Sequence, residues 1–357
     1  MLLLLLIGIL PALLVGLVGQ HQAAGALDQR ARADLSNLAA SVVDKLDRTL
    51  FERSGDVRLF ADVIRNGPLF TGSVGSFMDT ALAAYAPMYR LIVMADPGGH
   101  ISAVSSVDQH GQTINSPALL EHDVRGQPWY QAWATGPTAD AAFVQDLHDD
   151  PLLAAVYGDA GRTVTFSYPV HDINGQRAGV LALFFNWDVA DTIIAEVLDQ
   201  PRRDGGASIN LTLVNSRNQV LSTSETQRAV GATLDLSAFT SGLGAVRGSG
   251  AGQPEAGAPQ AVSADWQGLM ASYAVSRGYG TYPGLGWAAL ASQAPHEALA
   301  ALRTLQLQLG AFGALVALVV ALVATRIGGG IARPLLALTG STQRAAAGDL
   351  SQQVTVT

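Results

Sequence analysis

Cysteine is absent from the sequence of 357 residues. Its absence excludes a disulfide framework, a catalytic thiolate and a cysteine-ligated metal. Charged residues are also few, at 14%, and the net charge is -8. Because binding to a phosphate backbone requires a clustered basic face, and no run of Lys or Arg supplies one, we expect no nucleic-acid partner.

The short motifs of common catalytic sites are missing as well. The sequence has no Gly-x-Ser-x-Gly, no phosphate-binding glycine loop that opens a helix, and no His-Glu-x-x-His arrangement or its inverse. The histidines are scattered, and we interpret His148-Asp149-Asp150 as a solvated loop rather than a cation site. We therefore predict that the chain has no catalytic residue, no cofactor and no metal site, and that it is not an enzyme. This prediction does not extend to an output domain beyond Thr357.

Two uncharged apolar stretches lie near the ends of the chain, at Met1–Gly19 and Thr304–Thr325. The second is rich in Leu, Val and Ala, and its length matches the thickness of a bilayer crossed by a helix. We predict transmembrane helices at 1–20 and 304–325. Arginines at 326, 333 and 344 follow the second helix with a single acid, Asp349, so that flank is predicted to be cytoplasmic and the middle of the chain extracytoplasmic.

The first apolar stretch leaves two alternatives open. It lacks the basic residues that precede a signal peptide or a signal anchor, so we expect the true start of the protein to lie upstream. Small residues at Ala23-Ala24-Gly25-Ala26 follow it, which is typical of a cleavage site. The stretch is therefore either a membrane anchor or a cleaved signal peptide, and both alternatives export the middle of the chain.

The residues from Asp28 to Asn66 predict one long amphipathic helix. Apolar residues recur there at three-, four- and seven-residue steps: Leu35, Leu38, Val42, Leu46, Leu50, Val57, Phe60 and Ile64. Asn66-Gly67-Pro68 predicts the end of the helix.

Beyond this helix, extended runs separated by turn signals predict antiparallel hairpins. Two pairs of runs form a first set, at 91–94 with 101–104 and at 163–170 with 178–185. Two more pairs repeat the pattern in shorter form, at 209–214 with 219–222 and at 270–275 with 287–291. The repetition indicates a second, smaller copy of one module. Gly242–Pro259, which is rich in Gly, Ala and Pro, is interpreted as a surface loop.

The whole arrangement resembles a bacterial chemoreceptor with a double Cache sensor, in which two PAS-like modules are stacked on one long helix. Three local signatures carry the resemblance: Leu50-Phe51-Glu52-Arg53, Asp123 to Tyr130, and Ser167-Tyr168-Pro169-Val170 followed by Gly179-Val180. The tail, with Pro334 and Ala347-Gly348-Asp349-Leu350, is similar to the first helix of a HAMP signal-relay module.

The resemblance implies a mixed α/β (α+β) fold with antiparallel sheets. The expected domains are an extracytoplasmic sensor at 21–303, made of a long helix (28–66), a distal module (67–190) and a proximal module (191–295), and a partial HAMP module at 326–357. It also implies a homodimer in contact through the 28–66 helix, located in the bacterial inner membrane.

In this family the Pro-Trp-Tyr segment lies over the ligand pocket of the distal module, and Trp129 and Tyr130 supply it here. Aromatic rings with polar edges suit a small polar ligand. In family members that bind amino acids, an arginine and a tyrosine hold the carboxylate and an aspartate holds the ammonium group. Gln127, His122 and Phe184 stand at those positions here. We therefore predict a small-molecule ligand that is not an ordinary α-amino acid.

Three further residues complete the predicted pocket or its surroundings. Arg125 contacts an anion if its loop turns inward and otherwise lies on the surface, as most arginines do. Asp146 and His148 follow the aromatic segment and are predicted to line the pocket.

We expect a signalling receptor, most consistent with a methyl-accepting chemotaxis protein. Two alternatives stay open: a sensor histidine kinase or diguanylate cyclase with the same sensor, and a membrane-tethered module that binds solute without signalling.

Overall fold

The computed structural model describes residues 2–67, 73–134, 141–204, 208–239, 261–300, 307–308, 310–323 and 325–326, without the side chains of 2–17, 20 and 134. Contacts divide the chain into two units. One unit is Arg32–Pro295, and the other combines Met1–Ala31 with His296–Thr357.

The first helix, α1, spans Leu2–Asn66, which confirms the long helix predicted from its apolar periodicity. Within Arg32–Pro295, most of its predicted apolar face is buried: Leu35, Val42, Leu46, Leu50, Val57 and Phe60 are buried, and Leu38 and Ile64 are half-buried. Gly67 ends the helix as predicted, with a positive φ of 40° and an amide that donates to the carbonyl oxygen of Ile64.

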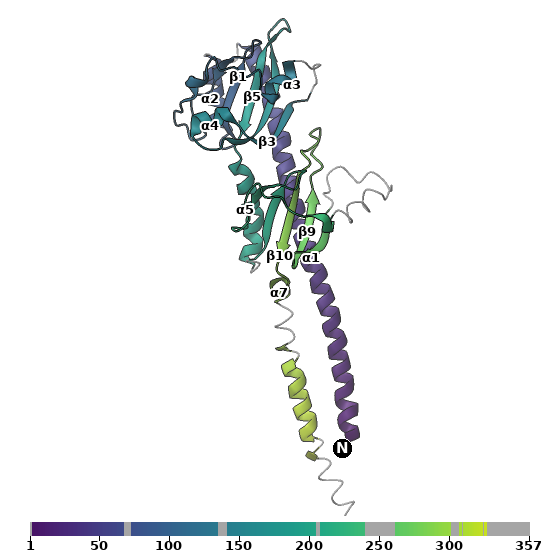
Figure 1. Ribbon diagram of the computed structural model, residues 1–357. Helices are drawn as coiled ribbons and strands as arrows, with labels where there is room; N and C mark the ends of the chain where they lie inside the picture. The colour runs from purple at the N-terminus through teal and green to yellow at the C-terminus, as the bar shows by residue number, and fades with distance from the viewer. Residues whose placement is uncertain are drawn as a thin grey trace, which may run out of the picture. The chain divides into compact units, whose positions relative to one another are not determined.

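Two antiparallel five-stranded sheets follow α1 (Figure 1). The first has the strand order β2-β1-β5-β4-β3. Its strands are β1 (Tyr89–Ala95), β2 (Ile101–Val104), β3 (Phe143–Asp149), β4 (Arg162–His171) and β5 (Arg177–Phe185). The second has the order β7-β6-β10-β9-β8. Its strands are β6 (Asn210–Val214), β7 (Val220–Thr223), β8 (Ala261–Trp266), β9 (Leu269–Val275) and β10 (Ala288–Gln293).

The two strand orders are the same order shifted by five strands, so the second sheet repeats the topology of the first. The four predicted hairpins are confirmed by the pairings of β1 with β2, β4 with β5, β6 with β7, and β9 with β10. The strands β3 and β8, which close corresponding edges of the two sheets, were not predicted.

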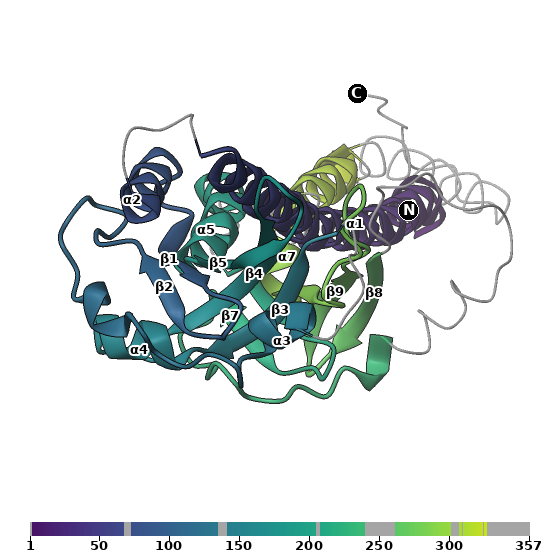
Figure 2. The same ribbon diagram turned by 90° about the horizontal axis from the view of Figure 1, so that it is seen from above.

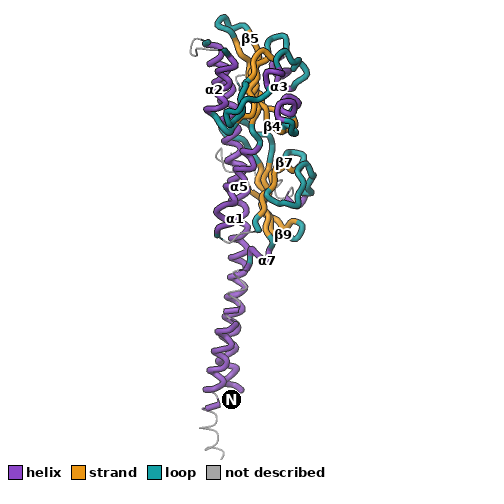
Figure 3. The backbone as a smooth tube through the Cα atoms, turned by 90° about the vertical axis from the view of Figure 1, so that its left-hand side faces the viewer, coloured by secondary structure: helices purple, strands orange, loops and turns teal. Residues whose placement is uncertain are grey.

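Besides α1, the described helices are α2 (Val74–Ala84), α3 (Pro128–Ala134), α4 (Pro151–Tyr157) and α5 (Asp188–Arg203), with a 3-10 turn at Ser116–Leu119 and a short α7 at Pro295–Ala298. In the first sheet, α2 contacts β1 and β2, and α3 contacts β3, β4 and β5, whereas α5 contacts β7 of the second sheet. Figures 2 and 3 show α1 and α5 on one side of the strands and α3 on the other. The face covered by α3 and α4 holds a hydrophobic core that includes Trp129, Leu153 and Phe184.

Two aspartates of α1, the buried Asp47 and the half-buried Asp56, attach the helix to the two modules. Asp56 accepts a hydrogen bond of 2.6 Å from the hydroxyl of Tyr89 at the start of β1. Asp47 accepts hydrogen bonds from the Ser276 hydroxyl (2.7 Å) and the Gly278 amide (3.1 Å), just beyond β9. Each module therefore has its own polar attachment to the same helix.

The second unit contains a helical segment at 310–323. At least half of the surface of several large apolar side chains is exposed there: Phe312, Leu315, Leu318, Val319, Leu322 and Val323. In the described part of the chain, no helix is long and apolar enough to cross a membrane. The predicted segment 304–325 lies partly outside that part, and the side chains of 1–17 and the predicted HAMP start from 327 onward also lie outside it.

Candidate functional site

The helix α3 buries the aromatic segment that the sequence singled out. Trp129 is fully buried, and its ring meets Phe184 of β5 edge-on, with centroids 6.2 Å apart and an interplanar angle of 85°. Tyr130 packs against Trp129 in the same way, at 6.2 Å and 86°. Three of the predicted site residues are therefore brought together on one face of the first sheet.

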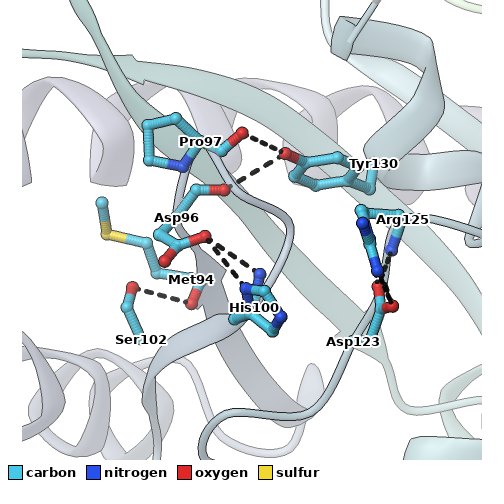
Figure 4. Close-up of polar contacts among 8 residues, drawn as sticks. All are labelled: Met94, Asp96, Pro97, His100, Ser102, Asp123, Arg125 and Tyr130. Atoms are coloured by element: carbon cyan, nitrogen blue, oxygen red, sulfur yellow. Dashed lines mark hydrogen bonds and ion pairs between the residues drawn. The ribbon is translucent and has the colours of Figure 1, made fainter.

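The hydroxyl of Tyr130 forms hydrogen bonds with the turn between β1 and β2. Its hydroxyl lies 3.2 Å from the carbonyl oxygen of Asp96 and 3.0 Å from that of Pro97 (Figure 4). The Asp96 carboxylate in turn accepts a hydrogen bond of 3.0 Å from the amide of His100. Tyr130 thus contributes ring surface to the core and holds the turn with its hydroxyl.

Arg125 lies on the surface. Its side chain is 65% exposed and forms a bidentate pair with Asp123, with the shortest contact at 2.6 Å (Figure 4). The guanidinium holds the pKa of the Asp123 carboxyl well below its usual range. His122 is exposed on the same segment, and its carbonyl oxygen accepts a hydrogen bond from the amide of Ile101. The segment extends the edge of β2, and neither side chain faces the buried side of α3.

Gln127 is half-buried immediately before α3. Its carbonyl oxygen accepts hydrogen bonds from the amides of Tyr130 (3.0 Å) and Gln131 (2.9 Å). The backbone of Gln127 therefore helps to start the helix.

The position of Asp146 differs from the predicted one. Its carboxylate accepts a hydrogen bond of 2.8 Å from the indole nitrogen of Trp287, the residue before β10 of the second sheet. Trp287 also meets Trp187 edge-on at 5.5 Å and 90°. Asp146 lies within an irregularity in the pairing of β3 with β4, between Gln145 and His148, and so links the two modules instead of lining the aromatic cluster.

The interpretation of residues 148–150 as a solvated loop is wrong. His148 belongs to β3, and Asp150 is 1% exposed. Asp150 caps the N-terminus of α4, where its carboxylate accepts hydrogen bonds from the amides of Leu152 (2.8 Å) and Leu153 (3.3 Å).

Five buried side-chain atoms in this region have no hydrogen-bond partner. They are Trp129 Nε1, Gln145 Oε1, His148 Nε2, Asp150 Oδ2 and Thr165 Oγ1. A buried polar group without a partner costs about 1–3 kcal/mol, and such groups are rare in folded proteins. Two of the five, His148 Nε2 and Asp150 Oδ2, lie 3.5 Å from each other.

The register of the sheet brings these atoms to the same face. Thr165 pairs directly with Phe184 on one side and with Gln145 on the other. Directly paired residues of neighbouring strands place their side chains on the same face of a sheet, and Phe184 faces Trp129. Thr165 and Gln145 therefore also face the α3 side. His148 pairs with Thr163, two residues from Thr165, and so shares this face.

The chemistry of the site is dominated by acceptors. His148 Nδ1 lies 2.9 Å from the carbonyl oxygen of Asp146, so this nitrogen carries a proton and donates. His148 Nε2 faces Asp150 Oδ2 at 3.5 Å. With the Gln145 oxygen and the Asp150 carboxylate as acceptors and the Trp129 N–H as a donor, the site suits a molecule with several N–H or O–H groups.

Gln145, Asp150 and Thr165 were not predicted from the sequence. The alternation of Thr163, Thr165 and Ser167 along β4 was the available signal, because it marks a polar stripe on a strand that is otherwise apolar. Gln145 could not be found without β3 and its register.

No family model matches the sequence, and no curated protein matches it. Among solved structures, the chain is similar to the ligand-binding domain of the Campylobacter jejuni chemoreceptor Tlp3 in complex with L-valine. The TM-score is 0.52 at 12% identity, over 77% of this chain and 97% of that one. At 12% identity this similarity establishes a shared fold alone.

Two further similarities have TM-scores below 0.5 and add nothing to this assignment. One is to the ligand-binding domain of the Pseudomonas aeruginosa PAO1 amino acid chemoreceptor PctC in complex with GABA, with a TM-score of 0.48 at 16% identity over 73% of this chain and 99% of that one. The other is to an extracellular ligand-binding receptor from Desulfohalobium retbaense, with a TM-score of 0.44 at 13% identity over 75% of this chain. The match spans 39% of the length of that receptor.

Proposed function

We propose that this chain is the sensor of a transmembrane signalling receptor of the chemotaxis class, and that its first module binds a small molecule on the α3 side of the sheet. The observation that carries the proposal is the set of buried polar atoms without hydrogen-bond partners on Trp129, on strands β3 and β4 and at the start of α4. The similarity to the Tlp3 ligand-binding domain supports it, because the folds correspond over 77% of this chain. In this proposal the sensor is extracytoplasmic and the receptor acts as a homodimer in the membrane.

The chemistry of the site favours a neutral or cationic ligand that is rich in hydrogen-bond donors. Asp150 adds a buried carboxylate, and Gln145 adds an amide oxygen. Arg125 is the arginine nearest in sequence to the aromatic segment, and its guanidinium is paired with Asp123 at the surface. A ligand carboxylate would therefore lack an arginine partner and would lie close to the Asp150 carboxylate, and we infer that ordinary α-amino acids are not the ligand.

The same strand that lines the site also touches the second module. Gln145 and His148 flank Asp146 on β3, and Asp146 holds the indole of Trp287 at 2.8 Å. Trp287 leads directly into β10, which ends at Gln293. We infer that a ligand that reorders the irregular part of β3 changes this contact, and that β10 carries the change towards 304–325.

A thermal-shift screen of the full chain tests the proposal, because a ligand that binds only the folded state raises the melting temperature. Amines, amides and polyols are the expected ligands. With such a ligand in hand, Trp129→Phe and Thr165→Val should each weaken binding about tenfold, which corresponds to about 1.4 kcal/mol for one buried hydrogen bond.

Two matched variants control for general damage to the site. Trp133 donates its indole N–H to Ser167 Oγ at 2.9 Å, and Thr163 donates its hydroxyl to the carbonyl oxygen of Phe185 at 2.9 Å. Trp133→Phe and Thr163→Val should therefore lower stability and change affinity much less than their counterparts. Tight binding of common α-amino acids that survives in Trp129→Phe and Thr165→Val would refute the proposed site.

The signalling step has its own test. Ligand-dependent crosslinking between cysteines placed in 1–20 and 304–325 should be lost in Trp287→Phe while ligand binding is retained. Trp266→Phe, which removes an indole hydrogen bond within the second sheet, is the control and should keep the response. Binding without any ligand-dependent crosslinking in the unmodified sequence would favour a tethered binding module instead.

A further inference from the structure

A cavity of about 320 Å³ lies on the α5 side of the molecule, away from the α3 site. Side chains from α5, from β7 and from the first residue of β4 line it. Its apolar wall includes Leu198 and Leu221, and the buried indole of Trp187 forms another part. The volume and this lining are typical of a site for a small organic molecule.

The charges in the lining are unequal. Two guanidinium groups, Arg162 and Arg202, face one carboxylate, Asp191, so the lining carries a formal charge of +1 from +2 and -1. Asp191 already accepts a hydrogen bond from the hydroxyl of Ser222. Arg162 lies 3.4 Å from the exposed carboxylate of Asp149. Within the described ranges, the Arg202 guanidinium has no ion-pair partner.

We propose that this cavity is a second binding site, which takes a small monoanionic carboxylate with an apolar body. Planar guanidinium groups pair with carboxylates in a bidentate geometry, and Arg202 offers such a group at the rim. The apolar body lies against Leu198, Leu221 and the face of Trp187, where its burial is favourable. The site differs from the α3 site in the sign of the charge that it selects.

The cavity adjoins the contact between the two modules, so its occupant would act on that contact. Trp187 lines the cavity, and its ring meets that of Trp287 edge-on with centroids 5.5 Å apart. The indole nitrogen of Trp287 donates a hydrogen bond of 2.8 Å to the Asp146 carboxylate. An occupant of the cavity therefore contacts Trp187, whose ring packs against Trp287, the residue through which we propose that the first module reaches the second. The proposed carboxylate site does not depend on the function proposed above, because its geometry is independent of the α3 site.

Isothermal titration calorimetry of the full chain with benzoate tests the proposal. We expect binding with one benzoate per chain, and at least tenfold weaker binding of benzamide, which has the same ring and no charge. Arg202→Gln should weaken benzoate binding about tenfold, and Arg162→Gln about threefold, because Arg162 is shared with Asp149.

Arg203→Gln is the matched control. Arg203 is the next residue of α5, is paired with Asp199 and is not part of the lining, so this variant should bind benzoate unchanged. Trp129→Phe should also bind it unchanged, which separates this site from the α3 site. Absence of benzoate binding, equal binding of benzamide, or equal losses in Arg202→Gln and Arg203→Gln would each overturn the proposal.

Discussion

The two sheets share a topology and differ in how the equivalent face is filled. On the α3 face of the first sheet, Trp129 is fully buried and its indole nitrogen has no partner. In the core of the second sheet, Trp266 is also buried, but its indole nitrogen donates to the carbonyl oxygen of Asp235 at 2.7 Å. One tryptophan has an unused donor, and the other has a closed hydrogen bond.

The surroundings of the two tryptophans show the same contrast. The core of the second sheet is apolar and aromatic, with Phe239 stacked on Tyr273 at 5.5 Å and 28°. In the described part of the second module, the unpaired buried oxygens belong to Ser208 and Tyr282, and neither belongs to that core. The comparison teaches that one topology accommodates two kinds of core: the core of the first sheet has buried polar atoms without hydrogen-bond partners at its border, and the described core of the second sheet has none.

The largest expected effect is on the free energy of unfolding, from a substitution in the packed core of the second sheet. Phe239→Ala should lower the free energy of unfolding by about 3–5 kcal/mol, because a fully buried ring is removed from a packed core. Urea unfolding of the full chain measures the change. The affinity for a ligand of the α3 site should stay unchanged at a temperature where the variant is folded. A large loss of affinity would show that the two faces do not have separate roles.

A smaller effect comes from exchanging each tryptophan for phenylalanine. Trp129→Phe and Trp266→Phe remove the same ring volume, so the difference between their unfolding free energies reports the hydrogen bond. We expect Trp266→Phe to be more destabilising by about 1 kcal/mol, because it leaves the Asp235 carbonyl without its donor. Equal costs in urea unfolding without ligand would mean that Trp129 has a partner in solution.

The attachments of the two modules to α1 differ in their pH dependence. Burial raises the pKa of both Asp47 and Asp56. A raised pKa stabilises the folded state below about pH 4, near the ordinary carboxyl pKa, and this contribution is lost as pH rises through the raised value. Arg53 Nε lies 2.9 Å from the Asp56 carboxylate and forms an ion pair with it that lacks the alignment of a hydrogen bond. Asp47 instead accepts hydrogen bonds from two neutral groups, the Ser276 hydroxyl and the Gly278 amide.

Asp47 should therefore show the larger pH effect. We expect the unfolding free energy of the unmodified chain minus that of Asp47→Asn to decrease from pH 4 to pH 7, and the same difference for Asp56→Asn to decrease less. Urea unfolding at both pH values gives the two differences. An increase with pH for Asp47→Asn would contradict the raised pKa.

The sequence was sufficient for most of the strands and for the long helix. Pairs such as β1 and β2 were predictable because apolar runs flank an Asp-Pro-Gly-Gly turn at 96–99. The strands β3 and β8 were missed because most of their residues are half-buried or exposed, so neither carries the apolar run or regular alternation that predicts a strand. The other two edge strands, β2 and β7, were predicted because a turn signal links each of them to an apolar run.

The aromatic part of the site was predictable and its polar part was not. Trp129 and Tyr130 stand in a short local motif, whereas Gln145 and Thr165 meet only through the register of two strands. Burial decides whether a polar side chain needs a partner, and burial depends on contacts between distant parts of the chain. The same reason explains why Asp150 was interpreted as solvated, although the structure buries it at the start of α4.

The smallest effect is expected at the edge of β2, where the predicted Arg125 lies. Arg125→Gln removes an exposed ion pair with Asp123, and solvent screens such a pair strongly. We therefore expect no measurable change in unfolding free energy and a change of less than about twofold in ligand affinity. Asp150→Asn is the contrasting variant, because it removes a buried charge and keeps an oxygen that can cap α4. It should weaken a cationic ligand at least tenfold, and a larger effect of Arg125→Gln than of Asp150→Asn would place the site at the surface edge instead of the α3 face.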